Sequence, residues 1–184
     1  PLYAYEFNGY WKDVGTLNSY WEANMELIDI VPEFNLYEEY WKIYTKNDIL
    51  PPQFLGANSV IDKCIIGEGS EIYGQVYNSV IGCGVIIDEG AIVRDSIIMN
   101  NTTIGKNCNV QKAIIDEFVK IGDCVEIGLM AEKENDTRPD IYNSGIVTIG
   151  EKTVIPSKVK IGKNAVISGV TEAGDYPGGI LDSG

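Results

Sequence analysis

Histidine is absent from the 184 residues, and its absence limits the chemistry that the chain can perform. Imidazole is the usual general base, the usual activator of a nucleophilic hydroxyl and the commonest metal ligand in proteins. Every mechanism that needs an imidazole group from this chain is therefore excluded. The remaining candidates for chemistry are four cysteines, the carboxylates and a small number of lysines.

The four cysteines are Cys64, Cys83, Cys108 and Cys124, separated by 19, 25 and 16 residues. They form no C-x-x-C pair, so the spacing gives no support to a zinc or redox site. Each lies inside an apolar repeat, where a free thiol behaves as a small hydrophobic side chain. We therefore expect structural thiols and a reducing, cytoplasmic compartment.

The charge balance is strongly acidic, with 14 Lys and Arg against 27 Asp and Glu and a net charge of -13. Such a surface repels phosphate backbones and anionic lipid, so nucleic acid and membranes are poor partners. No apolar run approaches the roughly 18 to 20 residues that a membrane-spanning helix requires.

Four lysines fall within twelve residues: Lys152, Lys158, Lys160 and Lys163. We interpret them as a solvated, solubilising face of the protein. The alternative is a regulatory site that binds an anion, because clustered positive charge attracts one.

The N-terminal segment, residues 1–50, holds all three tryptophans and predicts one amphipathic helix. Apolar residues recur at helical spacing from Leu17 to Ile28. Thr16 is the predicted N-cap, and Pro32 ends the helix. The aromatic stretch that follows must pack on something, since it is too rich in Tyr and Trp for a free linker.

From residue 60 onward the apolar pattern has a period of six. Aliphatic residues begin the hexads, at Ile66, Ile72, Ile81, Ile87, Val93, Ile98, Ile104, Val110, Ile115, Ile121, Ile127, Ile149, Ile155, Ile161 and Ile167. The starts at 81, 98 and 115 are 17 residues apart, so two hexads and one five-residue segment make a coil. Four positions after a start comes a further apolar or small residue, such as Val85, Ile97, Cys108 or Ile114. This internal repeat outranks every local signal in the chain.

The repeat predicts a solenoid with three short strands in each turn. Two side chains of every hexad point inward, and the small residue that often follows the start, frequently glycine, lets the backbone turn at a corner. Parallel strands about 4.8 Å apart give roughly five coils and a prism about 24 Å long. Coils are stable only when stacked, so the end coils need caps, and we expect the aromatic N-terminal segment to supply one. Hexapeptide repeats of this kind resemble the left-handed parallel β-helix.

The pair Pro51-Pro52 divides the chain into residues 1–50 and residues 51–184. A charged stretch at about residues 129–145 interrupts the hexads, and we expect a solvated insertion there, with a functional loop as the minority interpretation. The Gly-rich closing residues are expected to fray. The chain lacks an initiator Met and opens within an aromatic stretch, so we expect a piece of a longer protein.

A β-helix of this type suggests two different functions. One is acyl transfer, as in the trimeric hexapeptide-repeat acyltransferases, but those enzymes rely on a histidine general base, which this chain lacks. The other is a non-catalytic prism at the C-terminus of a sugar-nucleotide synthesising enzyme, where it assembles subunits and carries regulation.

The N-terminal segment favours the second function. Its run from Gly9 to Thr16, GYWKDVGT, resembles the end of the catalytic domain in the glucose-1-phosphate adenylyltransferase family. Further matching stretches are Trp21–Leu27, Trp41–Thr45, Leu50–Phe54, Ser144–Thr148 and Val154–Pro156. The resemblance covers essentially all 184 residues, and its specific part is the GYWKDVGT run, because hexads alone occur in many unrelated enzymes.

This resemblance implies a mainly β fold, with a left-handed β-helix preceded by a short helical, aromatic segment from the end of an α/β nucleotidyltransferase domain. It implies the synthesis of ADP-glucose and pyrophosphate from ATP and glucose 1-phosphate, the committed step of bacterial glycogen synthesis, in a cytoplasmic enzyme that self-associates as a homotetramer or heterotetramer. Asp13 falls on a metal-holding aspartate that acts on Mg²⁺ with a second, earlier aspartate. Trp11 falls on an aromatic position lining the glucose-phosphate pocket.

The resemblance also places the nucleotide loop and the remaining site residues in a preceding domain. We therefore assign no catalytic residue to this chain and expect the 184 residues alone to be inactive. Plant and cyanobacterial members bind an activator through β-helix lysines, but Glu117 and Glu151 stand at the two matching positions here. Those departures argue against a copied activator site.

Two alternatives stay open. One is a non-catalytic regulatory subunit of the same enzyme, against which the intact run from Lys12 to Thr16 argues. The other is a related nucleotidyltransferase, such as a mannose-1-phosphate guanylyltransferase, because the selectivity for the base resides in the preceding domain.

Overall fold

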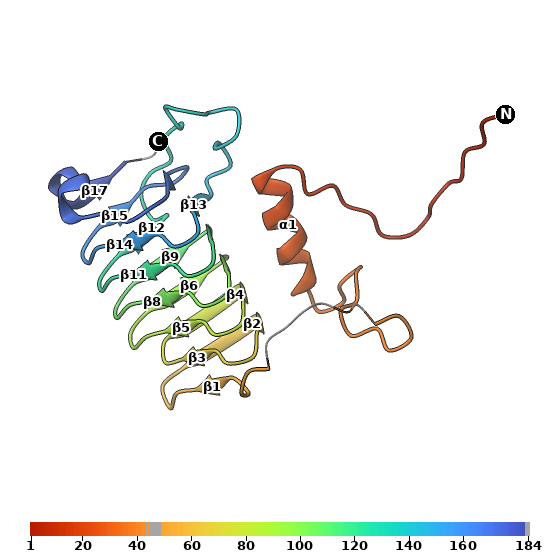
Figure 1. Cartoon of the computed structure of the whole chain (residues 1–184), viewed down its shortest axis with the longest axis horizontal. Coiled ribbons are helices and arrows are strands. Elements are labelled where there is room, and N and C mark those ends of the chain that lie inside the picture. Colours follow the sequence, from red (N-terminus) through yellow and green to blue (C-terminus); the bar gives the residue numbers. More distant parts are fainter. Residues whose placement is uncertain (43, 45–48, 183–184) are drawn as a thin grey trace.

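The computed structural model describes residues 1–42, 44 and 49–182. Within them, helix α1 (Leu17–Leu27) lies beside a stack of short parallel strands, and the N-terminal residues extend away from both (Figure 1). A parallel β-solenoid of hexapeptide repeats preceded by a short helix is therefore confirmed. Two residues of the Trp41–Thr45 match, Ile43 and Thr45, lie outside the described residues. No described helix is long and apolar enough to cross a membrane.

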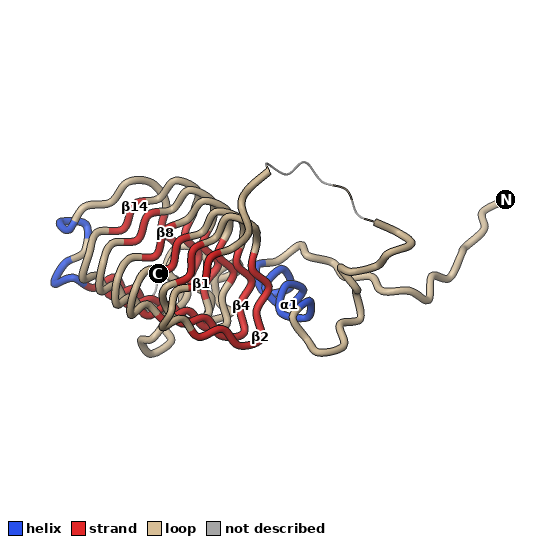
Figure 2. Tube along the Cα trace, turned by 90° about the horizontal axis from the view of Figure 1, so that it is seen from below, coloured by secondary structure: helices blue, strands red, loops and turns tan. Residues whose placement is uncertain are grey.

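The strands line three faces of the solenoid, which Figure 2 shows from below. The first face contains β1 (Phe54–Leu55), β3 (Glu71–Ile72), β5 (Ile86–Ile87), β8 (Thr103–Ile104), β11 (Lys120–Ile121) and β14 (Val154–Ile155). The second contains β6 (Ile92–Arg94), β9 (Asn109–Gln111), β12 (Glu126–Ile127), β15 (Lys160–Ile161) and β17 (Ile180–Leu181). The third contains β7 (Ile97–Ile98), β10 (Ala113–Ile115), β13 (Val147–Ile149) and β16 (Val166–Ile167).

Two longer strands, β2 (Val60–Ile66) and β4 (Gln75–Ile81), bend around the corner between the second and third faces. The first half of β4 pairs with β6 and its second half pairs with β7. The strand pairing is parallel throughout, and Ile104 pairs with Ile87 on one side and Ile121 on the other, which confirms the 17-residue coil. Six strands on the first face, about 4.8 Å apart, give the stack a length of about 24 Å.

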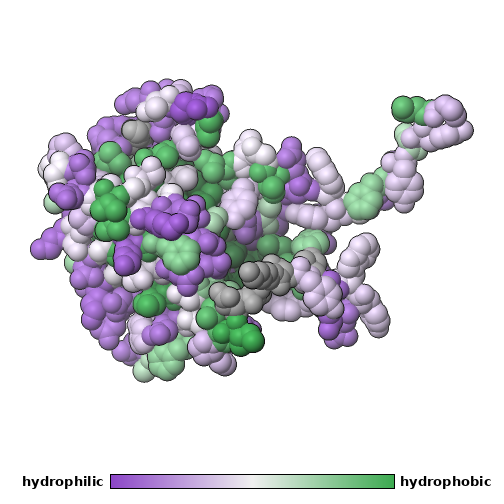
Figure 3. Space-filling model, viewed as in Figure 1, coloured by the Kyte–Doolittle hydropathy of each residue, from purple (hydrophilic) through white to green (hydrophobic). Residues whose placement is uncertain are grey.

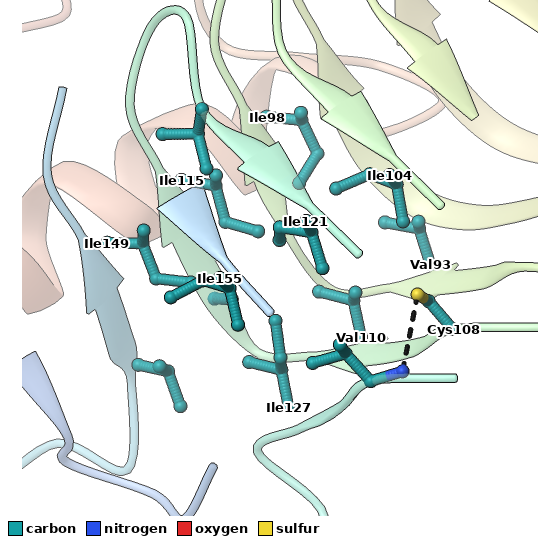
Figure 4. Packing of buried hydrophobic residues seen from close by; sticks show 14 of the residues in the cluster. Val93, Ile98, Ile104, Cys108, Val110, Ile115, Ile121, Ile127, Ile149 and Ile155 are labelled. Carbon is teal, nitrogen blue, oxygen red and sulfur yellow. Dashed lines mark hydrogen bonds between the residues drawn. The ribbon is translucent and has the colours of Figure 1, made fainter. Parts of the chain in front are cut away.

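The hexad starts form the buried core, because side chains alternate between the two sides of a strand. Ile87, Ile104, Ile121 and Ile155 are at most 4% exposed and pair in sequence along one face. Figure 4 shows three of them, Ile104, Ile121 and Ile155, in the core. The second inward residue of each segment lies two positions before the next hexad start. That position is four residues after the preceding start only where the two starts are six residues apart. The prediction that Ile97 and Ile114 point inward was therefore wrong. On the five-residue third face the inward residues are Ser96 and Ala113, and both isoleucines face outward.

Buried hydroxyls replace part of the strand ladder where the chain turns. The Ser96 hydroxyl donates to the carbonyl of Arg94 at 2.6 Å and accepts from the backbone N–H of Ala113, one coil further on, at 3.1 Å. Thr102 bonds the carbonyl of Asp116 and the N–H of Val119 in the same way. Because buried polar groups are costly when unpaired, these bonds let the interior tolerate hydroxyls.

The glycines that follow the hexad starts have a different role from the one predicted. Most left-handed corner residues lie two or three positions after a start, as Gly84, Asn101 and Lys112 do, whereas Gly128 directly follows the start at Ile127. Gly82 and Gly122 come directly after their starts and are needed because the next coil passes too closely. A Cβ on Gly122 would lie 2.6 Å from the backbone nitrogen of Ser157.

The two ends of the solenoid also differ from the expectation. In the described part of the chain, α1 packs on the outside of the third face and not over the first coil, where the aromatic N-terminal segment was expected to lie. The closing residues, expected to fray, form two 3-10 turns, Ala173–Asp175 and Pro177–Gly179, before β17. Tyr176 between them is 4% exposed and hydrogen-bonds Thr171 at 2.8 Å, which caps the last coil.

The close passage at Gly122 can be tested by substitution. We expect Gly122→Ala to lower the free energy of unfolding by about 2 kcal/mol, because backbone on the next coil cannot move aside without disturbing the stack. Gly174→Ala is the matched control, since a Cβ there meets nothing within 4 Å. Denaturant titration of both variants measures the difference, and equal midpoints would contradict the packing argument.

Candidate functional site

The segment preceding α1 is extended and held to the helix by its even-numbered residues. The Tyr10 hydroxyl donates to a carboxylate oxygen of Glu26 at 3.1 Å. Lys12 forms an ion pair with Glu26 and lies 3.6 Å from Glu22. Its hydrogen bond to Glu26 raises the pKa of Lys12 and lowers that of the carboxyl, so both groups are charged at neutral pH.

Trp11 and Asp13 alternate with these anchors and are exposed to solvent. The Trp11 side chain is 76% exposed, although it is a large apolar residue. Asp13 accepts a hydrogen bond from the backbone N–H of Gly15 at 2.9 Å through Oδ1, which closes a turn just before α1. The structure therefore brings the two predicted site residues to the free side of one anchored segment.

The turn at Asp13 leads directly into the N-cap of α1. Thr16 accepts from the N–H of Ser19 at 3.1 Å, and the Ser19 hydroxyl accepts from the N–H of Thr16 at 3.1 Å. This reciprocal capping box satisfies two of the free donors at a helix start. The predicted N-cap is confirmed, and it fixes the position of Asp13 relative to the helix.

α1 is in turn fixed to the solenoid by an apolar cluster. Its side chains Leu17, Tyr20, Trp21 and Met25 pack on Ile97, Ile114 and Ile146 of the third face. The indole N–H of Trp21 donates to the carbonyl of Asp95 at 2.7 Å. The Lys112 ammonium lies 5.6 Å from the centre of a Trp21 ring, within the range of a cation–π contact. No pattern in the sequence identifies Lys112, because its contacts come from segments far apart in the chain.

A groove opens between the start of α1 and the 128–146 loop, which connects β12 to β13. It has a volume of about 490 Å³. One wall is formed by Val14, Gly15, Thr16, Leu17, Asn18 and Tyr20, and the other by Asp140, Ile141, Asn143 and Ser144.

As a metal ligand Asp13 supplies one hard, exposed oxygen donor, which fits Mg²⁺ held by few protein carboxylates. The part of the chain that the structure describes contains no group of three or more His, Cys, Asp or Glu able to hold a metal ion. The described residues would therefore hold a metal ion only together with ligands from outside them.

The four candidate regulatory lysines do not converge on one surface. Lys152 lies between β13 and β14, Lys158 between β14 and β15, Lys160 on β15, and Lys163 between β15 and β16. Because those strands belong to different faces, lysines that are close in the sequence are spread around one coil. Lys152 lies 2.6 Å from Glu151 and Lys160 lies 3.0 Å from Glu126, so carboxylates partly offset their charge. A regulatory role for them stays a prediction.

The four cysteines are free. Cys108 is buried, donates to the carbonyl of Gly122 and accepts from the N–H of Val125 at 3.5 Å (Figure 4). Burial raises the pKa of its thiol to about 11, so it is no nucleophile at neutral pH. Cys124 differs from the expectation, since it is exposed at a left-handed corner.

Two protein families match the chain in succession. Residues 51–149 match the family described as GlmU-like, C-terminal hexapeptide, and residues 1–30 match the family described as nucleotidyl transferase. The nucleotidyl transferase match contains both Trp11 and Asp13, and the hexapeptide match contains most of the solenoid.

The chain is also similar to curated proteins named glucose-1-phosphate adenylyltransferase. The protein from Lachnospira eligens is 63% identical over 183 residues, which are 100% of this chain and 43% of that protein. The one from Acetivibrio thermocellus is 46% identical over 99% of this chain and 43% of its own length, and that from Thermotoga maritima is 44% identical over 100% and 43%. The chain thus spans about 43% of the length of these relatives.

The buried thiol predicts a pH dependence of stability. The thiol of Cys108 loses its proton near its ordinary value of 9.0 when unfolded and at about 11 when folded. Stability from the neutral thiol is therefore complete below pH 9 and is lost as the pH rises toward 11. We expect this loss to be about 2 kcal/mol larger in the wild type than in Cys108→Ser, whose hydroxyl matches Ser96 and Thr102 and does not ionise. Denaturant titrations at pH 8 and pH 11 measure it, and parallel losses in both proteins would contradict the burial argument.

Proposed function

The chain belongs to the family of GlmU-like C-terminal hexapeptide domains, and on that premise we propose that it is the C-terminal part of an enzyme that makes ADP-glucose. The reaction joins ATP and glucose 1-phosphate. An oxygen of the sugar phosphate bonds to the α-phosphorus of ATP, the bond from that phosphorus to the α,β-bridging oxygen breaks, and pyrophosphate leaves.

One observation carries this proposal. A nucleotidyl transferase match over residues 1–30 and a hexapeptide match over residues 51–149 occur in one chain, and the chain aligns over its whole length with a protein named glucose-1-phosphate adenylyltransferase. The 63% identity extends over 100% of the chain and so includes the segment with Trp11 and Asp13. These relatives favour the adenylyl enzyme over a guanylyltransferase.

Asp13 is proposed to hold Mg²⁺ together with a carboxylate that precedes this chain. A bound Mg²⁺ would neutralise negative charge on the phosphates of the substrates. The exposed Trp11 is proposed to form one wall of the sugar-phosphate pocket, because an aromatic ring covers a sugar face and excludes water. Both side chains lie opposite the anchors Tyr10 and Lys12, which supports a role toward a preceding domain.

The described residues bring no further group to the reaction. They contain no metal cluster, and the carboxylates of Glu22 and Glu26 near Lys12 leave little positive potential for a triphosphate. We therefore propose that these 184 residues supply a metal ligand, Asp13, and a pocket wall, Trp11, but no general acid, general base or nucleophile. We further propose that they are inactive alone and belong to a cytoplasmic enzyme.

The solenoid is further proposed to assemble subunits. Its first coil exposes Phe54, Leu55 and Val60, which are 54%, 49% and 42% exposed. The free edges of β1 and β2 also lie there, and an open strand edge is a template for pairing with another chain. Exposed apolar side chains likewise line the N-terminal segment (Figure 3), where the preceding domain would cover them.

The role of Asp13 can be tested in the full-length protein with Asp13→Asn. The amide keeps an acceptor for Gly15 and removes the charge, so the fold should be unchanged. We expect Mg²⁺-dependent release of pyrophosphate from ATP and glucose 1-phosphate to fall roughly 100-fold or more, since metal binding supplies several kcal/mol. Asp88→Asn is the control, because Asp88 also accepts from a neighbouring backbone N–H, at 2.8 Å from Glu89.

The outcomes separate the alternatives. Activity that survives Asp13→Asn would remove the metal role from that residue. Wild-type activity with GTP or UTP in place of ATP would identify a different nucleotidyltransferase. Inactivity with all three nucleotides would favour a regulatory subunit.

A further inference from the structure

We propose that the 128–146 loop positions the segment that carries Trp11 and Asp13, and that Asn164 and Lys112 are the side chains that hold this loop. The loop interrupts the hexads, and its sequence predicts a solvated insertion with no role. Its contacts in the structure indicate a different interpretation. The consequence for activity rests on the proposed function, whereas the mechanical coupling does not.

Asn164 ties both ends of the loop to the solenoid. Its Oδ1 accepts from the N–H of Gly145 at 2.6 Å, and its Nδ2 donates to the carbonyl of Lys133 at 2.7 Å. Its own carbonyl accepts from Asn135 Nδ2 at 2.8 Å. Asn135 and Asn164 are each 2% exposed. A solvated insertion has no need of two buried, fully bonded amides, because burying them unpaired is costly.

Lys112 connects the loop to α1. This residue occupies a left-handed corner of the solenoid, between β9 and β10. Its ammonium donates to the carbonyl of Ser144 at 2.6 Å and also lies over the Trp21 ring. One side chain therefore contacts the corner, the end of the loop and the helix.

The loop also supplies part of the surface on which α1 rests. Ile146, its last residue, is 2% exposed and belongs to the apolar cluster that contains Leu17 and Trp21. Residues 140–144 face the first turn of the helix across the groove. A shift of the loop would therefore change the support beneath the start of α1.

The start of α1 determines where Asp13 lies. Asp13 is bonded to Gly15, which directly precedes the N-cap Thr16, and Lys12 is paired with Glu26 on the same helix. Displacing a reacting group by about 1 Å can reduce a rate by about 100-fold. Asn164 and Lys112 are thus positioning residues that act through the loop and α1.

The experiment uses the full-length protein with Asn164→Gly and Lys112→Met. Glycine keeps the left-handed backbone of Asn164 and removes both side-chain bonds, whereas methionine removes the ammonium. The matched controls are Asn101→Gly and Lys152→Met, at corners with similar φ on a different edge of the prism. Hydrogen exchange is measured for amides in residues 10–27, together with the Mg²⁺ concentration that gives half-maximal pyrophosphate release.

We expect exchange in residues 10–27 to become at least threefold faster in both variants and in neither control. We expect the half-maximal Mg²⁺ concentration to rise by a similar factor, and Lys112→Arg, which keeps a donor for Ser144, to restore both values. Amides of the solenoid should exchange slowly in every variant, so faster exchange there would reveal a variant that unfolds globally. If Asn164→Gly unfolds in this way, the result for Lys112→Met tests the proposal.

Unchanged exchange in residues 10–27 of Lys112→Met would overturn the proposal, whatever the activity. Faster exchange in a protein that is inactive with every nucleotide would support the coupling while refuting the proposed function. Faster exchange with unchanged Mg²⁺ dependence would overturn the link from the loop to Asp13.

Discussion

The outward apolar surface of the third face is the contact on which the remaining structure depends. Most coils of a solenoid need side chains only inside, yet Ile97 and Ile114 point outward and are 3% and 4% exposed. They are buried because α1 covers them, with Ile146 completing the surface. Burying three such side chains is worth several kcal/mol, since each contributes roughly 1.5 to 3 kcal/mol. This burial attaches a nucleotidyltransferase segment to the side of a hexapeptide prism.

The polar contacts around this surface fix the position of α1 on it. Hydrophobic burial alone would let the helix slide, whereas the Trp21 bond to Asp95 fixes one point along it. The capping box and the bond between Asp13 and Gly15 then extend the fixed geometry to the predicted site. The solenoid thus supplies the surface that holds α1, because its in-register coils place Ile114 beside Ile97 on the next strand.

The sequence period predicts the coil length, the core columns and the parallel register, because each depends only on residues six or 17 positions apart. It fails where a single residue shifts the phase: on the five-residue face, counting four positions from the hexad start selects Ile97 instead of Ser96 as the inward residue. The period also gave the wrong role for the glycines after the hexad starts. Gly122 is required because Ser157, 35 residues away in the sequence, passes close to it, and no local sequence pattern indicates such an approach. Proximity in the sequence likewise does not place the four lysines on one surface, because twelve residues turn around most of one coil.

The helix and its N-cap were predicted because capping is local, but the surface to which α1 binds was not. One measurement tests that surface directly: the hydrogen-exchange rate of the three tryptophan indole N–H groups, observed by NMR in the 184-residue chain. Trp21 should exchange far more slowly than Trp11 and Trp41, which are 76% and 83% exposed. Ile114→Asp should abolish this protection, whereas Ile86→Asp, on the outside of the first face, should leave it intact. A Trp21 indole that exchanges as fast as the other two in the wild type would contradict the docking of α1.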